Sequence, residues 1–270
     1  MITYNTAGRV VFCIFFIFFS LKAYPDSYFR PTLIVADVDF REYTKEGKVF
    51  NSDIGTLTGE SLLFGIESQK LKAEVSYKKL SGDLSYWSEI ALSKSTISQY
   101  EYGIQTSFML SPDQAQLKYY LISYLGDKKK HRLIQSADDY FGLDESYNAR
   151  NIALGIEAFY PHNKNTMLKV SFIARKSYNA TASVNFLSEN YDGFESRTPN
   201  GSIVNFSLGY LKRLNKKISL IIELDHEKAL SPRSKKQSLF RNGNKLNSFA
   251  SFPKSEESTT GFNVGLTVNY

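Results

Sequence analysis

The chain has 270 residues, with 33 Lys and Arg against 27 Asp and Glu, and it is rich in Phe (20) and Tyr (18). A single Cys excludes an internal disulfide framework and a Cys-rich zinc site. A hydrophobic fraction of 42% is ample for a core and excludes wholesale disorder.

Residues 1–23 have the features of a secretory signal peptide. Arg9 supplies a positive charge, residues 10–21 form an apolar run, and Ala23 offers a small residue at the cut. The run is shorter than the roughly 20 apolar residues that a spanning helix needs. A retained N-terminal anchor is the alternative. We therefore expect export of a single domain made of residues 24–270.

The rest of the chain shows the alternation of apolar and polar residues that is typical of β-strands. No stretch after residue 23 has 18 consecutive apolar residues, so transmembrane helices are not expected. Ten segments alternate: 31–41, 60–67, 70–79, 100–110, 117–125, 151–160, 167–175, 202–211, 218–225 and 262–270. The pattern predicts an all-β protein.

The connections between these segments alternate strictly between short and long. Four are tight turns, at 68–69, 111–114, 161–165 and 215–216, and five are long, at 42–59, 80–97, 126–148, 176–201 and 226–258. Both chain ends fall on the side of the tight turns. This layout predicts an antiparallel transmembrane β-barrel with short periplasmic turns and long extracellular loops. We expect ten strands, within a range of eight to twelve.

The last segment carries a resemblance to a known family. Phe262, Val264, Leu266, Val268 and Tyr270 share one face, and this aromatic-terminated strand resembles the assembly signal of bacterial outer-membrane β-barrels. The resemblance implies recognition by the barrel-assembly machinery of a Gram-negative envelope and a place in the cell outer membrane. Phe is the commoner last residue, so Tyr270 departs from the pattern. Residues 81–86 and 253–256 resemble patterns in small barrels of unknown function, and this likeness implies no activity.

The inward-facing residues predict a filled lumen. Five glycines fall on the inner face, one in each even-numbered segment: Gly65, Gly103, Gly155, Gly209 and Gly265. There they would allow the backbone to bend or make room for a large neighbour, and a ligand tunnel lined by small residues is the alternative. Inward charges are expected at Asp37, Asp39, Glu67, Glu74, Glu101, Glu157, Glu223 and Asp225, and at Arg41, Lys72, Lys78, Lys169 and Arg175. Narrow barrels are filled by such side chains, although a restricted, cation-favouring pore stays open as an alternative.

The three histidines offer little for catalysis. His162 falls in a predicted turn, and His131 falls in a basic run, 128–132, that we expect to be a solvated loop. His226 is the one weak catalytic candidate, although Asp225 and Glu227 point to the opposite face of its strand. The chain has no serine-hydrolase elbow and no zinc-protease motif, so we expect no cofactor and no metal. Enzymatic activity stays uncertain, with the balance against it.

The last long loop is strongly basic. Residues 227–258 hold seven Lys and Arg against three Glu. On the outer surface they would face the phosphates of lipopolysaccharide. The expected contacts are Arg233, Lys235, Lys236, Arg241 and Lys245, and a solvated loop without a partner is the alternative. Nucleic acid is a poor partner for an exported barrel.

Three functions follow as hypotheses. The leading one is a non-catalytic structural or surface-interaction role in the envelope. The second is a narrow, porin-like channel for small or apolar solutes, and the third is a hydrolase of lipid or peptide at the rim. The pattern predicts neither the ligand nor the oligomeric state.

Overall fold

The computed structural model describes residues 27–112, 115–137, 141–187 and 191–270. The predicted signal peptide therefore lies outside the described residues. Within them the chain forms thirteen β-strands. No helix long and apolar enough to cross a membrane is found in this part of the chain.

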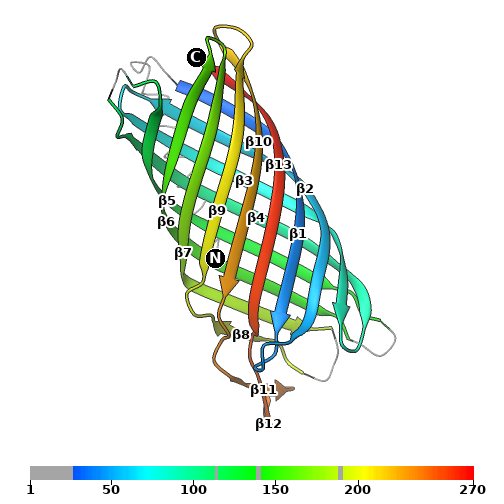
Figure 1. Cartoon of the computed structure of the whole chain (residues 1–270). Helices are drawn as coiled ribbons and strands as arrows, with labels where there is room; N and C mark the ends of the chain where they lie inside the picture. Colours follow the sequence, from blue (N-terminus) through cyan, green and yellow to red (C-terminus); the bar gives the residue numbers. More distant parts are fainter. Residues whose placement is uncertain (1–26, 113–114, 138–140, 188–190) are drawn as a thin grey trace, which may run out of the picture.

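Ten of the strands close into an antiparallel barrel, as the sequence predicts (Figure 1). They are β1 (Ser27–Tyr43), β2 (Val49–Glu67), β3 (Leu71–Ser88), β4 (Leu92–Met109), β5 (Lys118–Ile134), β6 (Leu143–Asn163), β7 (Thr166–Phe186), β9 (Ser202–Arg213), β10 (Ile218–Ser231) and β13 (Lys254–Asn269). Each pairs with its two neighbours, the first strand β1 pairs with the last strand β13, and the β6–β7 pairing completes the ring. Closure leaves no barrel strand with an unpaired edge.

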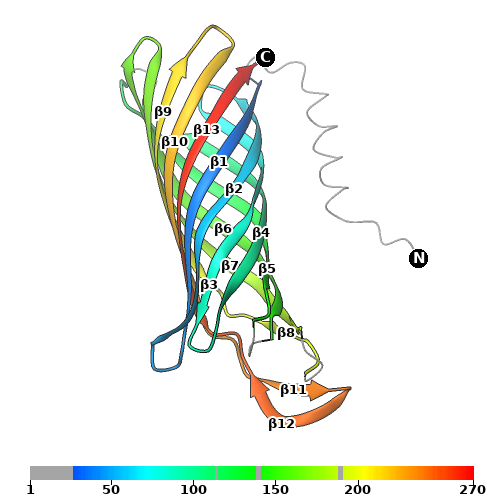
Figure 2. The ribbon, with the colours of Figure 1, turned by 90° about the vertical axis from the view of Figure 1, so that its right-hand side faces the viewer.

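The two ends of the barrel differ, because one end carries two connections, 187–201 and 232–253, that are longer than any at the other (Figures 1 and 2). At one end the strands join through short connections, 68–70, 110–117, 164–165 and 214–217. The two described ends of the chain meet there, where the Tyr270 backbone N–H donates to the Ser27 carbonyl at 3.0 Å. We call this the short-turn end. The other, called the long-loop end, carries the remaining connections.

The strands reach much further toward the long-loop end than the alternation indicates. All five connections predicted to be long are largely strand; for example, the β1–β2 link is only 44–48, the β3–β4 link only 89–91 and the β5–β6 link only 135–142. At about 3.3 Å per residue an 18-residue strand is about 60 Å long, roughly twice the thickness of a bilayer core. The prediction failed there because the outer wall beyond the lipid is mostly polar, so an apolar residue no longer marks the outward face.

An apolar belt surrounds the half of the barrel near the short-turn end. Its outward-facing side chains include Leu33, Val35, Leu62, Ile104, Phe108, Leu121, Leu125, Ile152, Leu154, Ile156, Leu168, Val170, Phe172, Val204, Phe206, Leu208, Leu224, Phe262, Val264 and Leu266, each at least 36% exposed. Tyr119, Tyr160, Tyr210 and Tyr270 follow at the edge near the short turns. A tall apolar band with an aromatic girdle is the lipid-facing surface of an outer-membrane barrel. Beyond it the outer wall is mostly polar.

The connection that joins β10 to β13 forms a projecting hairpin at the long-loop end (Figure 2). Its strands are β11 (Gln237–Arg241) and β12 (Asn244–Ala250), and Asn242 and Gly243 between them have φ angles of 50° and 75°. Asn-Gly favours this left-handed two-residue turn. The dipeptide is therefore a sequence signal for the hairpin, where a long loop was predicted. Short β8 (Phe194–Arg197) pairs with β7 nearby.

Candidate functional site

The centre of the barrel's long-loop half is an ion-paired cluster. On β5 the alternation directs Lys128, Lys130 and Arg132 into the lumen and Lys129 and His131 outward. The expectation that residues 128–132 form a solvated loop is therefore wrong. The run extends a strand whose inward residues contact acids from other strands. A basic run in a sequence does not show which acidic residues will lie next to it in the fold.

Arg132 lies at the heart of this cluster and is fully buried. Its guanidinium contacts three carboxylates: Asp53 at 2.6 Å, Glu145 at 2.8 Å and Glu42 at 3.2 Å. Ser95 donates a hydrogen bond to Asp53, and Tyr147 donates one to Glu145. We call this group the Arg132 cluster. It ties β1, β2, β4, β5 and β6 together across the lumen.

The Arg132 cluster holds more buried acid than base. Burial raises the pKa of the Glu42 carboxyl to about 7, although Arg132 opposes the shift and the charge on Glu145 adds to it. Burial alone would lower the pKa of Arg132, but the three carboxylates raise it well above its usual value. The guanidinium therefore stays charged, while Glu42 takes up a proton more readily than an ordinary glutamate.

A second group of ion pairs lies next to the Arg132 cluster. Lys130 Nζ donates to Glu257 at 2.6 Å, and Lys128 Nζ contacts Glu227 at 3.2 Å and Glu257 at 3.7 Å. Burial favours the neutral acid, yet the two lysines hold the pKa of Glu257 below its usual value. Glu227 and Glu257 were expected in the last long loop. They instead cross the lumen from β10 and β13, and we call these four residues the lysine layer.

The half of the lumen near the short turns is also ion-paired. Lys169 contacts Glu223 at 2.8 Å and Glu157 at 3.2 Å, and Arg175 contacts Glu101 at 2.8 Å. Tyr28 donates a hydrogen bond to Glu74, while Tyr124 donates to Glu101 at 2.6 Å. These acids and bases are among those predicted to point inward. They pair with one another, and most of them also line the lumen cavity near the short-turn end.

Three charged residues predicted to face the lumen face outward instead. Asp37, Asp39 and Arg41 lie on the outer wall of β1, where Arg41 Nη2 contacts Asp39 at 2.6 Å and Thr56 donates to Asp37 at 2.7 Å. Their inner neighbours belong to an apolar cluster of Ile34, Ala36, Val38, Phe40, Leu57, Leu80, Leu84 and Ile97. The prediction assumed lipid outside β1 throughout. Beyond the belt water lies outside, so polarity no longer identifies the inner face.

The five glycines on the predicted inner face stand against close neighbours. A Cβ at Gly65 would overlap the ring of Tyr28, and one at Gly103 would overlap the ring of Tyr124. A Cβ at Gly209 would come within 3.1 Å of Lys169 Cβ, while Gly155 and Gly265 lie against neighbouring backbone. At Gly65 and Gly103 the missing side chain makes room for a tyrosine that is hydrogen bonded to a buried glutamate.

Three cavities follow one another along the lumen. One of about 250 Å³ lies toward the short-turn end, and one of about 120 Å³ lies under the long-loop end. A cavity of about 20 Å³ shares Lys78, Glu101, Asp225 and Glu227 with the first and Lys128 with the second. The lysine layer thus separates the two larger cavities.

The histidines are all on the outer surface. His226 is exposed and its Nδ1 lies 3.0 Å from Thr260 Oγ1, while Asp225 and Glu227 point inward as expected. His131 Nε2 lies 2.6 Å from Asp144 Oδ1 on the outer wall. His162 is exposed near the short-turn end of β6. The structure therefore places no acid beside His226 on its own face, and no cluster of potential metal ligands occurs among the described residues.

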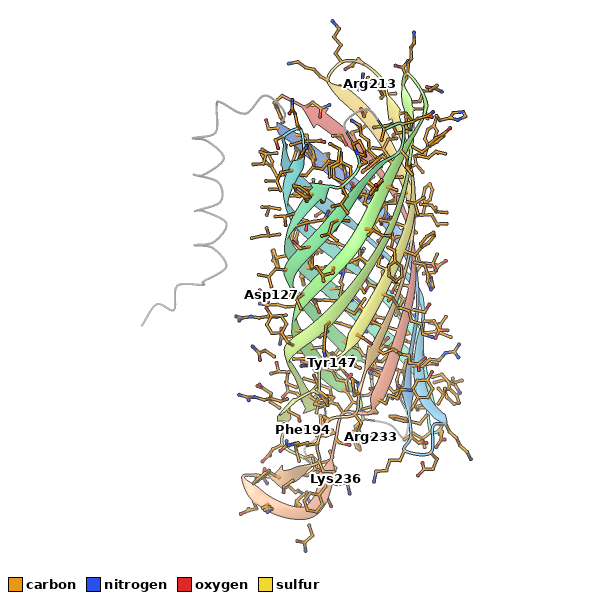
Figure 3. All side chains as sticks on the ribbon, turned by 60° about the vertical axis from the view of Figure 1, so that its left-hand side comes forward. Asp127, Tyr147, Phe194, Arg213, Arg233 and Lys236 are labelled. Carbon is orange, nitrogen blue, oxygen red and sulfur yellow. The ribbon has the colours of Figure 1, made fainter. Side chains whose placement is uncertain are left out.

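The basic residues of the last connection lie on and beside the β11–β12 hairpin. Lys235, Lys236, Arg241 and Lys245 are exposed, and Figure 3 shows Lys236 on the part that projects from the barrel. Arg233 differs, because its Nη2 donates to the Tyr43 carbonyl at 2.7 Å and fixes the start of the connection to the rim. Figure 3 also shows Arg213 at the opposite, short-turn end and Asp127 on the outer wall.

Sequence comparison finds no known family and no curated protein that matches the chain. Solved structures do match. The outer-membrane protease OmpT from Escherichia coli superimposes with a TM-score of 0.67 at 8% identity, over 92% of this chain and 98% of that one. The chain has the fold of a bacterial outer-membrane β-barrel.

Two further structures are similar at lower scores. The translocator domain of the autotransporter NalP from Neisseria meningitidis has a TM-score of 0.47 at 8% identity, covering 98% of this chain and 96% of that one. OprG from Pseudomonas aeruginosa has a TM-score of 0.40 at 10% identity, covering 92% and 96%. At these identities the likeness is one of fold, and function has to be argued from the site.

Proposed function

We propose that this protein is a non-catalytic barrel of the bacterial outer membrane with a closed lumen, acting in envelope structure or surface interaction. The Arg132 cluster carries the proposal. Fully buried Arg132 fills the lumen together with carboxylates from β1, β2 and β6, and the apolar cluster of β1 to β4 packs beside it. A general pore would instead need a lumen lined by hydrated side chains.

The proposed location rests on the barrel fold and on the sequence. The apolar belt fits a bilayer, and the aromatic-terminated strand from Phe262 to Tyr270 pairs along its length with β1. We propose export through the signal peptide of residues 1–23 and insertion by the barrel-assembly machinery. Recovery in the outer-membrane fraction, with a gel band that shifts only on boiling, would support both. A soluble, unshifted band would refute them.

The surface role is assigned to the β11–β12 hairpin. Its exposed Lys235, Lys236 and Lys245 fit the phosphates of lipopolysaccharide. Replacing these three by Gln should weaken binding of purified lipopolysaccharide and its dependence on salt. Lys216→Gln with Lys217→Gln at the short-turn end is the matched control and should leave binding unchanged. Equal binding by both variants would leave the hairpin without this role.

A narrow channel is the second candidate, because the three cavities form a series interrupted at the lysine layer. Planar-bilayer recordings of the wild-type chain separate the two candidates. We expect no conductance steps from the wild type, and discrete steps would favour the channel. Lys128→Ala removes a cation from the layer, whereas Lys129→Ala removes one from the outer wall of the same strand. Conductance gained only in Lys128→Ala would identify the layer as the closure.

No observation favours the hydrolase. His226 lies on the outer wall with a threonine as its hydrogen-bond partner, and the protease fold is shared at 8% identity. We expect His226→Ala and the wild type to give the same result in assays of peptide and lipid hydrolysis.

A further inference from the structure

The 120 Å³ cavity under the long-loop end is built like a small-molecule site. Its walls include the apolar side chains of Phe40, Ile203 and Phe252, each at most 6% exposed, and its polar lining includes Lys130 and Asn151. Ligand sites commonly combine apolar walls with a few placed polar groups. An engineered cavity of about 150 Å³ accepts benzene, so this one has room for a ring or chain of about six heavy atoms.

One polar group in the cavity lacks a partner. The Asn151 side chain is completely buried, and its Oδ1 accepts a hydrogen bond from Ser177 Oγ at 3.0 Å. Its Nδ2 has no hydrogen-bond partner among the described residues. A buried donor left without an acceptor costs free energy that a ligand oxygen would return.

Lys130 is a further donor in the cavity lining, beside the carboxylates of Glu42 and Glu257. The Lys130 ammonium has three N–H donors, and one of them is used by Glu257 at 2.6 Å. Its position over the Phe40 ring, 4.0 Å from the centroid, places cationic and apolar surface side by side. A ligand with an apolar body and an oxygen at one end would match this arrangement.

The rim of the cavity is formed by both connectors of the β11–β12 hairpin. Pro232 lies in the connector that leaves β10, and Pro253 in the one that enters β13. The Ser234 backbone N–H donates to the Phe252 carbonyl at 2.9 Å, and the Phe252 N–H donates to Ser234 Oγ at 2.9 Å. These bonds and the fixed φ of proline hold the two connectors together, so the rim is formed before a ligand arrives.

We propose that this cavity binds a small molecule carrying a carbonyl or carboxylate oxygen on an apolar body. The oxygen accepts from Asn151 Nδ2, and the body packs against Phe40, Ile203 and Phe252. The inference deepens the proposed surface-interaction role by giving it a ligand class, and it rests on that role for its biological meaning.

The test uses the full-length barrel in lipid nanodiscs, with cyclopentanone and butyrate, which have six heavy atoms each, as probes and saturation-transfer NMR as the readout. Empty nanodiscs supply the background. Saturable binding of at least one probe, about tenfold tighter than that of benzene, is expected because only the probes carry the acceptor. Preference for butyrate would assign a carboxylate, and preference for cyclopentanone a neutral carbonyl. No saturable binding of either probe would overturn the proposal.

Three variants locate the site. Asn151→Leu should weaken probe binding about tenfold by removing the donor, and Ala149→Leu should weaken it by filling the cavity, which Ala149 also lines. Asn148→Leu is the matched control, since Asn148 is exposed on the outer wall of the same strand. The boiling-dependent gel shift confirms folding of each variant, and Ala149→Leu carries the test if Asn151→Leu does not fold. Equal binding by all folded variants would refute the site. Wild-type conductance would refute the closed barrel and leave this result standing.

Discussion

Arg132→Leu offers the sharpest test of the ion-paired lumen. The guanidinium is fully buried and lies 2.6 to 3.2 Å from three carboxylates. Removing one partner of a buried ion pair costs about 3–5 kcal/mol, because the other charge is left uncompensated. Three acids share Arg132, so we expect Arg132→Leu to lower the free energy of unfolding by an amount at the upper end of that range near neutral pH.

The measurement is urea unfolding of the refolded barrel in lipid, followed by the boiling-dependent gel shift. Arg150→Leu is the matched control, because Arg150 contacts Asp127 at 3.5 Å on the outer wall and both side chains are more than half exposed. Exposed pairs contribute about 0–1 kcal/mol. The loss of unfolding free energy in Arg132→Leu should shrink at pH 4, where the carboxyl groups left without Arg132 take up protons. If Arg132→Leu loses within 1 kcal/mol as much unfolding free energy as Arg150→Leu, or if its loss is unchanged at pH 4, the buried ion pairs do not stabilise the barrel as argued.

Three further predictions concern separate parts of the molecule. Because burial raises the pKa of Glu42 from 4.5 to about 7, the folded state binds more protons than the unfolded state between these values, and stability should fall as pH rises from 4.5 to 7. Glu42→Gln should flatten that slope in urea titrations, and an equal slope in both proteins would contradict the assignment. Gly103→Ala should reduce the yield of the folded gel band more than Gly209→Ala, since a Cβ overlaps the Tyr124 ring at Gly103 but only approaches Lys169 at Gly209; equal yields would count against the packing argument. Asp192 accepts from the backbone N–H groups of Asn242 and Gly243 at 3.0 and 2.8 Å, so Asp192→Ala should speed proteolysis of the hairpin and leave the barrel band intact. Unchanged cleavage would show that the turn holds without this contact.

The sequence alone determined the barrel. Strict alternation in segments such as 151–160 and 262–270, together with the sorting of connections into short and long, predicted ten antiparallel strands and placed both chain ends at the short-turn end. Lipid contact imposes this regularity, because most outward residues in the belt are apolar while every second residue points inward. Where that constraint acts, a one-dimensional pattern is enough.

The tertiary structure alone decided what fills the lumen. Beyond the belt the outer wall meets water, so outward Asp37 and inward Glu42 look alike in the sequence although they lie on opposite faces of β1. The acids that neutralise Lys128, Lys130 and Arg132 come from β1, β2, β6, β10 and β13, up to 129 positions away along the chain. Periodicity specifies which side of a strand a residue occupies but not which residue stands across the lumen. That choice depends on the closure and register of the whole sheet, which therefore also set the ion pairs in the lumen and the cavity around Asn151.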